Sequence, residues 1–206
     1  NNTATAASNT ASSAYNAATA AQYDIDNLEV GGRNLLLGTN QGTKYWYNLN
    51  GNGSFGELQE IDDGYGNKGV RFTINTASTN WCVLSFAGSD SSYNAARILA
   101  GSAGEKFTVS FDIRHSNGYT PTSGMGFKDT NSQNTQWSAS LPAGLTLPAG
   151  EWVHVEATGI SNGTARSGQH FYWANLWPVG TLDVVNLKFE RGNKATDWTP
   201  APEDIE

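Results

Sequence analysis

The stretch EKFTVSFDIRHS (Glu105 to Ser116) shows the alternation of apolar and polar residues that decides the fold. Successive side chains of a β-strand point to opposite faces, so an alternating stretch predicts a strand with one buried face. The apolar face consists of Phe107, Val109, Phe111 and Ile113. The opposite face consists of Thr108, Ser110, Asp112 and Arg114. The stretch therefore predicts a β-strand that covers a hydrophobic core on one side.

Further strands are predicted on both sides of this stretch. Segments rich in β-branched and aromatic residues lie at 68–74, 80–88, 150–160, 169–180 and 182–192. Turn-rich stretches such as DDGYGNKG and SNGTARSG separate them, and the sequence contains 23 glycines. No convincing helical pattern follows residue 30. The sequence therefore predicts a mainly β fold, an antiparallel β-sandwich.

Residues 1–30 differ from the rest of the chain, because they contain no glycine or proline and are dominated by alanine. Apolar residues recur at alternating spacings of three and four, at Ala4, Ala7, Ala11, Ala14, Ala18, Ala21, Ile25 and Leu28. This heptad pattern predicts a helical coiled coil, and the alternative is a disordered linker. Gly31 and Gly32 are predicted to end the helix. The predicted domains are a coiled-coil stalk at 1–30 and a β-sandwich at 31–206.

The charge of the chain limits its partners. The formal net charge is −7, and no basic cluster is present. Because binding to nucleic acid relies on cationic contacts to phosphates, we expect no nucleic-acid partner, and an anionic membrane surface is disfavoured for the same reason. No stretch is long and apolar enough to span a bilayer. The single cysteine, Cys82, can form neither an internal disulfide nor a structural zinc site.

Three stretches of the sequence resemble a known family. They are GGRNLLLGTN (31–40), GEWVHVEATG (150–159) and LKFERGNKATDWTPAPED (187–204). They look like the opening, a late strand and the closing strand of carbohydrate-binding β-sandwich modules in tail or tail-fibre proteins of phages and prophages of Gram-positive bacteria. The resemblance implies a jelly-roll of two antiparallel sheets. It also implies non-catalytic binding of host cell-wall polysaccharide.

The resemblance has further implications for assembly and location. Residues 4–28 look like the trimeric coiled-coil stalks of tail proteins, so it implies a homotrimer that contacts other tail proteins. The expected location is the virion, acting outside the host cell at its surface. No cofactor is required. The resemblance allows a structural calcium ion near the chain ends, although no ligand set follows from the residues.

The stretch HFYWANLW (170–177) is the main candidate for a sugar site. Saccharide sites combine flat aromatic rings with amide, carboxylate or guanidinium groups that bind hydroxyls. A strand shows alternate residues to opposite faces, so one set must point away from the core. That set is either Tyr172 with His170, or Trp173 with Asn175 and Trp177. The alternative is that loops or a neighbouring subunit cover both faces.

Further candidate ligand residues lie in other parts of the chain. Trp46, Tyr47 and Trp137 stand in polar, loop-like surroundings, where functional residues are common. Trp81 begins a predicted strand, and it fits the site or the core equally well. Asp112 and Arg114 lie opposite the apolar row of their strand and suit hydroxyl recognition. They also fit an ordinary cross-strand ion pair.

Two other tryptophans are predicted to be structural, and two other functions are considered. Trp152 and Trp198 are expected to pack against the sandwich. One alternative function is a spacer domain of the tail with no saccharide ligand. The other is a cell-wall glycan hydrolase, for which Asp112 and Glu156 are the candidate carboxylates. The sequence contains no GxSxG motif, no phosphate-binding loop and no zinc-protease helix, so we expect no enzymatic activity.

Overall fold

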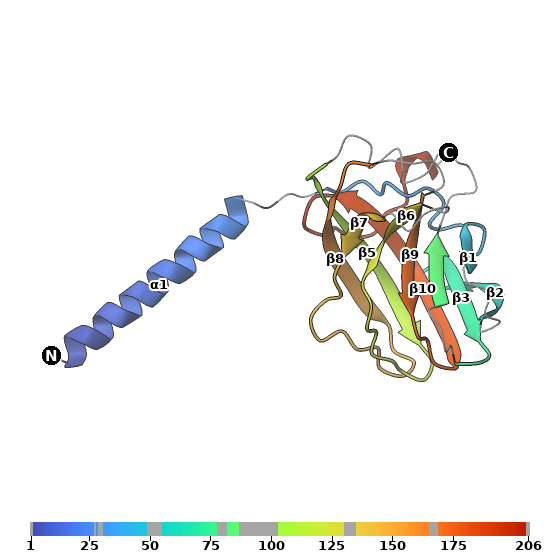
Figure 1. Cartoon of the computed structure of the whole chain (residues 1–206), viewed down its shortest axis with the longest axis horizontal. Coiled ribbons are helices and arrows are strands. Elements are labelled where there is room, and N and C mark those ends of the chain that lie inside the picture. Colours follow the sequence, from blue (N-terminus) through green and yellow to red (C-terminus); the bar gives the residue numbers. More distant parts are fainter. Residues whose placement is uncertain are drawn as a thin grey trace.

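The computed structural model describes residues 2–26, 28, 31–48, 55–77, 82–86, 103–129, 135–164 and 169–204. One long helix, α1 (Asn2–Asp26), precedes the strands, and a short 3-10 helix, η2 (Pro202–Asp204), follows them. The strands are β1 (Trp46–Asn48), β2 (Phe55–Asp62), β3 (Lys68–Ile74), β4 (Cys82–Phe86), β5 (Lys106–His115), β6 (Met125–Asp129), β7 (Thr135–Ala139), β8 (Val153–Ser161), β9 (Gln169–Asn175) and β10 (Gly180–Arg191). Figure 1 shows these elements in place.

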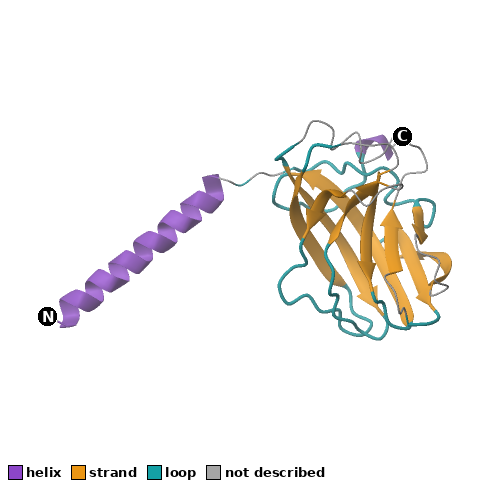
Figure 2. Ribbon diagram, in the orientation of Figure 1, coloured by secondary structure: helices purple, strands orange, loops and turns teal. Residues whose placement is uncertain are grey.

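The strands form one antiparallel sheet in the order β1-β4-β9-β6-β7-β8-β5-β10-β3-β2. The sheet curls so that β4, β9, β6 and β7 form one layer and β8, β5, β10, β3 and β2 form the other (Figure 2). Pairing of β7 with β8 joins the two layers. The predicted mainly β jelly-roll is therefore confirmed, with one difference: the two layers belong to a single continuous sheet.

Aromatic side chains fill the space between the two layers. Phe111 of β5 packs edge-on against Phe171 and Trp173 of β9, with ring centroids 6.0 Å and 5.6 Å away. Phe189 of β10 lies 4.5 Å from the ring of Phe127. The apolar row predicted at Phe107, Val109, Phe111 and Ile113 is buried as expected. Such contacts between large rings hold the layers together.

Four strands lie outside the segments that the sequence predicted as strands, namely β1, β2, β6 and β7. They contain glycines or several polar residues, and β1 has only three residues, which is too few to display an alternating pattern. Their pairing with neighbouring strands supplies the hydrogen bonds that make them strands. The loop assignment of Trp46, Tyr47 and Trp137 is therefore wrong, because all three lie in strands.

The chain segments that enter and leave the sandwich meet at a buried ion pair. The Nζ atom of Lys188 lies 3.6 Å from a carboxylate oxygen of Glu190, and neither side chain is more than 1% exposed. Glu190 accepts hydrogen bonds from the backbone N–H of Gly32 and from the N–H and hydroxyl of Thr196. We call Gly32, Lys188, Glu190 and Thr196 the terminal clasp. It ties the incoming and outgoing segments to the same strand, β10.

The closing segment packs as the sequence predicted. Trp198 is half-buried, and its Nε1 donates a hydrogen bond to the carbonyl of Leu187 at 3.1 Å. Trp152, also predicted to pack, is half-buried too. The carboxylate of Asp204 accepts a hydrogen bond from the N–H of Gly38.

Helix α1 stands away from the sheet (Figure 1). Every side chain of the helix whose burial is described is exposed. The helix ends at Asp26, five residues before the glycine pair that was predicted to end it, so Leu28 lies beyond the last turn. Among the described residues, no helix is long and apolar enough to cross a bilayer.

Candidate functional site

The structure decides between the two faces of strand β9. Trp173 and Trp177 are both 0% exposed, and their rings lie 5.3 Å apart in the core. Trp173 donates a hydrogen bond to the carbonyl of Ser123, and Asn175 accepts one from the hydroxyl of Tyr119. The prediction that Trp173, Asn175 and Trp177 bind a ligand is therefore wrong, because rings and amides enclosed in the core present no surface to a ligand.

Two other candidate tryptophans also belong to the core. Trp137 is buried against Phe127 and Phe189 and donates a hydrogen bond to the carbonyl of Phe107. Trp46 is buried against Phe72 and Phe86. The prediction that Trp137 and Trp46 bind a ligand is therefore also wrong, because both rings are enclosed in the core. Trp81 and the side chain of Tyr47 lie outside the described residues.

Tyr172 and His170 point away from the core, which was the other alternative for β9. Tyr172 is half-buried and His170 is buried, and their rings contact each other edge-on at 6.3 Å. They lie on the outer surface of the layer formed by β4, β9, β6 and β7. We call this surface the β9 face, and its residues are Ser85, Gly126, Thr135, Gln136, His170 and Tyr172.

Register places the β9-face residues next to one another. Tyr172 pairs with Ser85 of β4 on one side and with Gly126 of β6 on the other. A Cβ atom on Gly126 would lie 3.1 Å from both the Cε1 of Tyr172 and the Cγ2 of Thr135. The ring edge and the methyl group are thus neighbours across the glycine. Because Gly126 has no side chain, the Tyr172 ring can lie close to the sheet surface.

Two buried polar side chains of the β9 face have unsatisfied atoms. Ser85 and Gln136 are 0% exposed. The hydroxyl of Ser85 and both the Nε2 and Oε1 atoms of Gln136 have no hydrogen-bond partner within the part of the chain that the structure describes. Unpaired buried polar groups are rare in proteins, because each costs about 1–3 kcal/mol. Because Ser85 lies directly across from the aromatic Tyr172, the β9 face is the candidate site.

Arg114 lies on the outer surface of the other layer, on the opposite side of the molecule. Its guanidinium and that of Arg71 both bind the carboxylate of Asp183, at 2.6 Å. Arg114 also lies over the ring of Trp152, 4.4 Å from its centroid. Burial alone would raise the pKa of Asp183, but hydrogen bonds from the two arginines outweigh it and hold the pKa below its ordinary value. Arg114 therefore forms a cross-strand ion pair, which was the alternative role predicted for it.

Asp112 lies on the same surface as Arg114, and its carboxylate has two partners. It binds Nδ1 of His154 at 2.8 Å and accepts a hydrogen bond from the side-chain amide of Asn186. Burial alone would raise the pKa of Asp112, but these bonds outweigh it and lower the pKa. A glycosidase acid needs a raised pKa, so this environment suits a structural ion pair.

The described residues give little support for a metal site or for a catalytic site. Among them, no group of three or more His, Cys, Asp or Glu side chains is arranged to hold a metal ion. Glu156, the other carboxylate considered for hydrolysis, lies 3.6 Å from Nζ of Lys194. The Asp112 and Glu156 carboxylates are thus both engaged in contacts between strands and loops.

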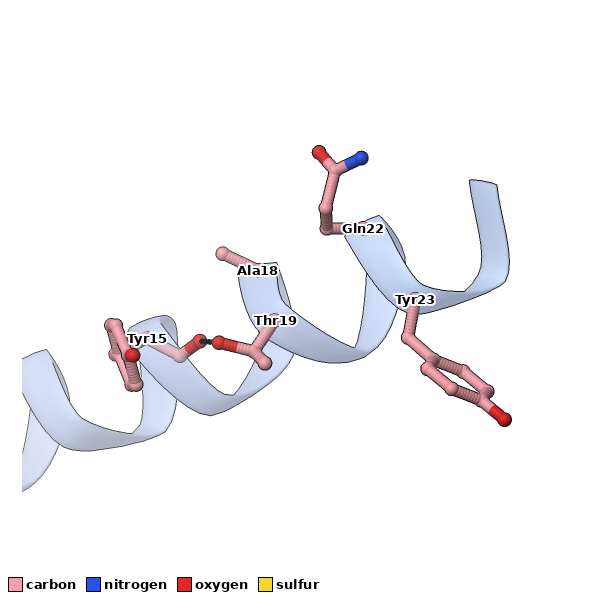
Figure 3. Close-up of a pocket in the computed structure, with 5 residues that line it drawn as sticks. All are labelled: Tyr15, Ala18, Thr19, Gln22 and Tyr23. Carbon is pink, nitrogen blue, oxygen red and sulfur yellow. Dashed lines mark hydrogen bonds between the residues drawn. The ribbon is translucent and has the colours of Figure 1, made fainter. Parts of the chain in front are cut away.

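A shallow hollow lies on α1, between Tyr15 and Tyr23, with Ala18, Thr19 and Gln22 completing its lining (Figure 3). Of these residues only Ala18 belongs to the predicted alanine seam, so the hollow lies beside the seam. The hydroxyl of Thr19 donates to the carbonyl of Tyr15, which leaves its methyl group for apolar contact. All five lining residues belong to α1, so the hollow is a surface feature of one helix.

Most of the β9-face residues were missed by sequence reasoning. Only Tyr172 and His170 were candidates, whereas Ser85, Gly126, Thr135 and Gln136 were not. Ser, Gly, Thr and Gln carry no distinguishing pattern in a polar sequence. Their relation to Tyr172 depends on strand order, which places β6 between β9 and β7.

No family model matches the sequence, and no curated protein matches it. Carbohydrate-binding modules recur among the solved structures that it resembles. A xylan-binding domain from Paenibacillus barcinonensis has a TM-score of 0.44 and 15% identity, and the match covers 79% of this chain and 94% of that one.

Two other similar structures belong to different classes of protein. The tripod from the baseplate of bacteriophage Tuc2009 has a TM-score of 0.49 and 15% identity, over 86% of this chain and 61% of that one. A cyclase from Fischerella has a TM-score of 0.47 and 10% identity, over 73% and 84%. Likenesses of this level concern the fold alone.

Proposed function

We propose that the chain binds saccharide, without catalysis, through the β9 face. One observation carries the proposal: the Tyr172 ring lies beside Gly126 and directly across from Ser85, whose buried hydroxyl has no hydrogen-bond partner in the described part of the chain. An aromatic ring stacks on the apolar CH face of a sugar, while a hydroxyl and an amide bind its hydroxyl groups. Pockets for polar ligands combine an apolar surface with a few such polar groups.

The proposed ligand is a polysaccharide of the bacterial cell wall, and the proposed setting is the adhesion apparatus of a phage or prophage tail. The resemblance of the stretches at 31–40, 150–159 and 187–204 to modules of such tails supports this setting. The helical α1, which precedes the sandwich, supports it as well. In this setting the chain acts outside the host cell, as part of the virion.

The proposed assembly is a homotrimer formed through residues 4–28. The heptad spacing of alanines and the exposure of α1 along its length both support a helical partner. An isolated alanine-rich helix is marginally stable in water, so packing against other copies stabilises it. Contacts with other tail proteins remain part of this proposal.

Titration calorimetry with purified host cell-wall polysaccharide tests saccharide binding. Tyr172→Ala is expected to weaken binding about ten-fold, since it removes a stacking surface worth roughly 1–1.5 kcal/mol. Tyr65→Ala is the matched control, because Tyr65 is 92% exposed in the β2–β3 turn, away from the β9 face. Equal affinity in both variants would contradict the assignment of the site. Absence of any saccharide binding would favour the spacer function, and release of sugar fragments would favour a hydrolase.

A further inference from the structure

We infer that the chain has a second ligand site, which binds an anionic group, carboxylate or phosphate, carried by a sugar. The site lies on the outer surface of the layer formed by β8, β5, β10, β3 and β2. We call this surface the arginine face, and its residues are Gln59, Arg71, Arg114, Trp152 and Asp183. The inference goes beyond the proposed function, because the arginine face is separate from the β9 face and binds independently of it.

Strand register brings the two arginines together on either side of Asp183. Asp183 of β10 pairs with Arg71 of β3 and with Arg114 of β5. The Nη2 atoms of Arg71 and Arg114 lie 2.8 Å and 2.6 Å from the same oxygen, Oδ2 of Asp183. The two guanidinium groups therefore converge on one point, and both are held in place before a ligand arrives.

The cationic groups of the arginine face are accessible, whereas the carboxylate between them is not. The side chains of Arg71 and Arg114 are 33% and 29% exposed, and that of Asp183 is 2% exposed. Asp183 binds Nε and Nη2 of each arginine, so these bonds leave both Nη1 groups as donors. One negative charge also balances only one of the two positive charges. A ligand thus meets N–H donors with a net positive charge, which an anionic group satisfies best.

The neighbours of the two arginines suit a sugar that carries the anionic group. Gln59 is exposed and pairs with Arg71, so its amide can bind hydroxyl groups next to the charge. On the other side, the guanidinium of Arg114 lies over the half-buried ring of Trp152, and this contact fixes its orientation. An amide, two guanidinium groups and an indole therefore follow one another across the outer surface of this layer.

Acidic side chains close to the arginine face keep its positive charge local. Asp112, on the same surface, binds Nδ1 of His154 at 2.8 Å, so its carboxylate is already engaged. Glu151 directly precedes Trp152 and is exposed, and the whole chain has a formal net charge of −7. Attraction of an anion over a long range is therefore weak. Binding depends on direct contact with the guanidinium groups.

Titration calorimetry with the whole chain compares charged sugars with matched neutral sugars. One pair is an oligomer of galacturonic acid and its methyl ester, which have equal length and linkage. The other pair is glucose 6-phosphate and glucose, which tests phosphate as the source of the charge. In at least one pair we expect the charged sugar to bind about ten-fold more tightly, because charge-assisted hydrogen bonds are roughly twice as strong as neutral ones. The NMR signal of the Trp152 indole N–H should shift in the same titration.

Two substitutions in the arginine face should change this preference in opposite directions. Arg114→Gln removes one positive charge and should abolish the preference, while Arg71 still binds Asp183. Asp183→Asn removes the competing negative charge and should strengthen binding of the charged sugar. A purely structural ion pair would not produce this increase. Melting temperatures show whether each variant is folded, and the comparison of sugars with the unaltered protein tests the site without any substitution.

Arg191→Gln is the matched control for Arg114→Gln. Arg191 also pairs with a carboxylate, that of Glu105, and its guanidinium also lies near an aromatic ring, that of Phe107. It lies at the end of β10 and outside the arginine face, so this variant should keep the preference.

Each outcome tells on a different claim. Equal affinity for the charged and neutral members of both pairs would overturn the anionic site. If acetate or inorganic phosphate alone binds as tightly as the charged sugar, the sugar part of the inference is overturned. A preference that survives in Arg114→Gln, or that is lost equally in Arg191→Gln, overturns the role of the arginine face. Tyr172→Ala should leave the preference intact, so this inference and the proposed function can fail separately.

Discussion

Lys188 and Glu190 are charged residues whose side chains lie fully inside the protein. Their strand alternates as the sequence predicted, with Leu187 and Phe189 turned to the core and the two charges turned away. They are nevertheless buried, because the closing segment crosses over them. Lys188 donates to the hydroxyl of Thr196 and to the carbonyl of Asp197. At this scale the environment of a residue depends on a segment that lies several residues further along the chain.

Substitution of Lys188 is predicted to be costly. Lys188→Met leaves the Glu190 carboxylate buried without its positive partner, and loss of one member of such a pair lowers the free energy of unfolding by about 3–5 kcal/mol. Urea denaturation measures the change. Lys68→Met is the control, because Lys68 and Glu60 form an exposed pair at 2.8 Å, with 55% and 48% of their side chains accessible. We expect no measurable change there, and similar losses in the two variants would contradict the buried role of Lys188.

His154 is predicted to make stability depend on pH. Its hydrogen bond to Asp112 raises the pKa of the imidazole above its ordinary value of about 6.5, despite an opposing effect of burial. A group with a raised folded pKa contributes stability below its unfolded pKa, and the contribution is lost as pH rises through the folded pKa. Asp112→Asn should lower the His154 pKa and flatten this dependence, as followed by NMR titration of the ring. Glu57→Gln, which alters an exposed β2 residue, should leave the His154 pKa unchanged; an equal shift in both variants would argue against the Asp112 contact.

Single elements of the fold could be predicted from the sequence where they are long enough to show a period. The alternation of β5 and β10 and the heptad of α1 are of this kind, and the fold class follows from them. Short strands such as β1 and β7 show one or two alternations, so Trp46 and Trp137 resembled loop residues. Their partners across the sheet make them core residues, and a single sequence does not state which strands pair.

The choice of face in β9 has the same physical origin. Residues 170–177 are aromatic on both sides, so composition alone leaves both faces open. Trp173 pairs with Leu84 of β4 and Met125 of β6, which are both apolar, whereas Tyr172 pairs with Ser85 and Gly126. The neighbouring strands thus decide which rings enter the core. The same register assembles the candidate site, and that is why four of its residues escaped sequence analysis.

At the scale of the whole molecule, α1 and the sandwich have separate predicted roles. In the proposed trimer, three copies of the β9 face on one stalk would raise the apparent affinity for a polymer by about 10²–10⁴ when they bind together. Ala18→Glu places a charge in the alanine seam and should reduce the trimer to monomers in sedimentation equilibrium. It should weaken binding to intact cell walls and leave affinity for a short oligosaccharide unchanged.

The control for this prediction lies on the same helix. Asn16→Glu adds the same charge two residues earlier, at a position that the heptad places outside the seam, and it should preserve both the trimer and cell-wall binding. An unaltered protein that sediments as a monomer would contradict the stalk. Equal effects of the two glutamates would contradict the seam.

The terminal clasp has a mechanical consequence. The carboxylate of Glu190 holds Gly32 on the incoming side and Thr196 on the outgoing side, with the N–H of Gly32 only 2.6 Å from the carboxylate. A pull applied to α1 therefore loads Glu190 and the outgoing segment first. None of the four clasp residues belongs to the layer of β4, β9, β6 and β7. A stalk under tension would thus leave the shape of the β9 face unchanged until the clasp gives way.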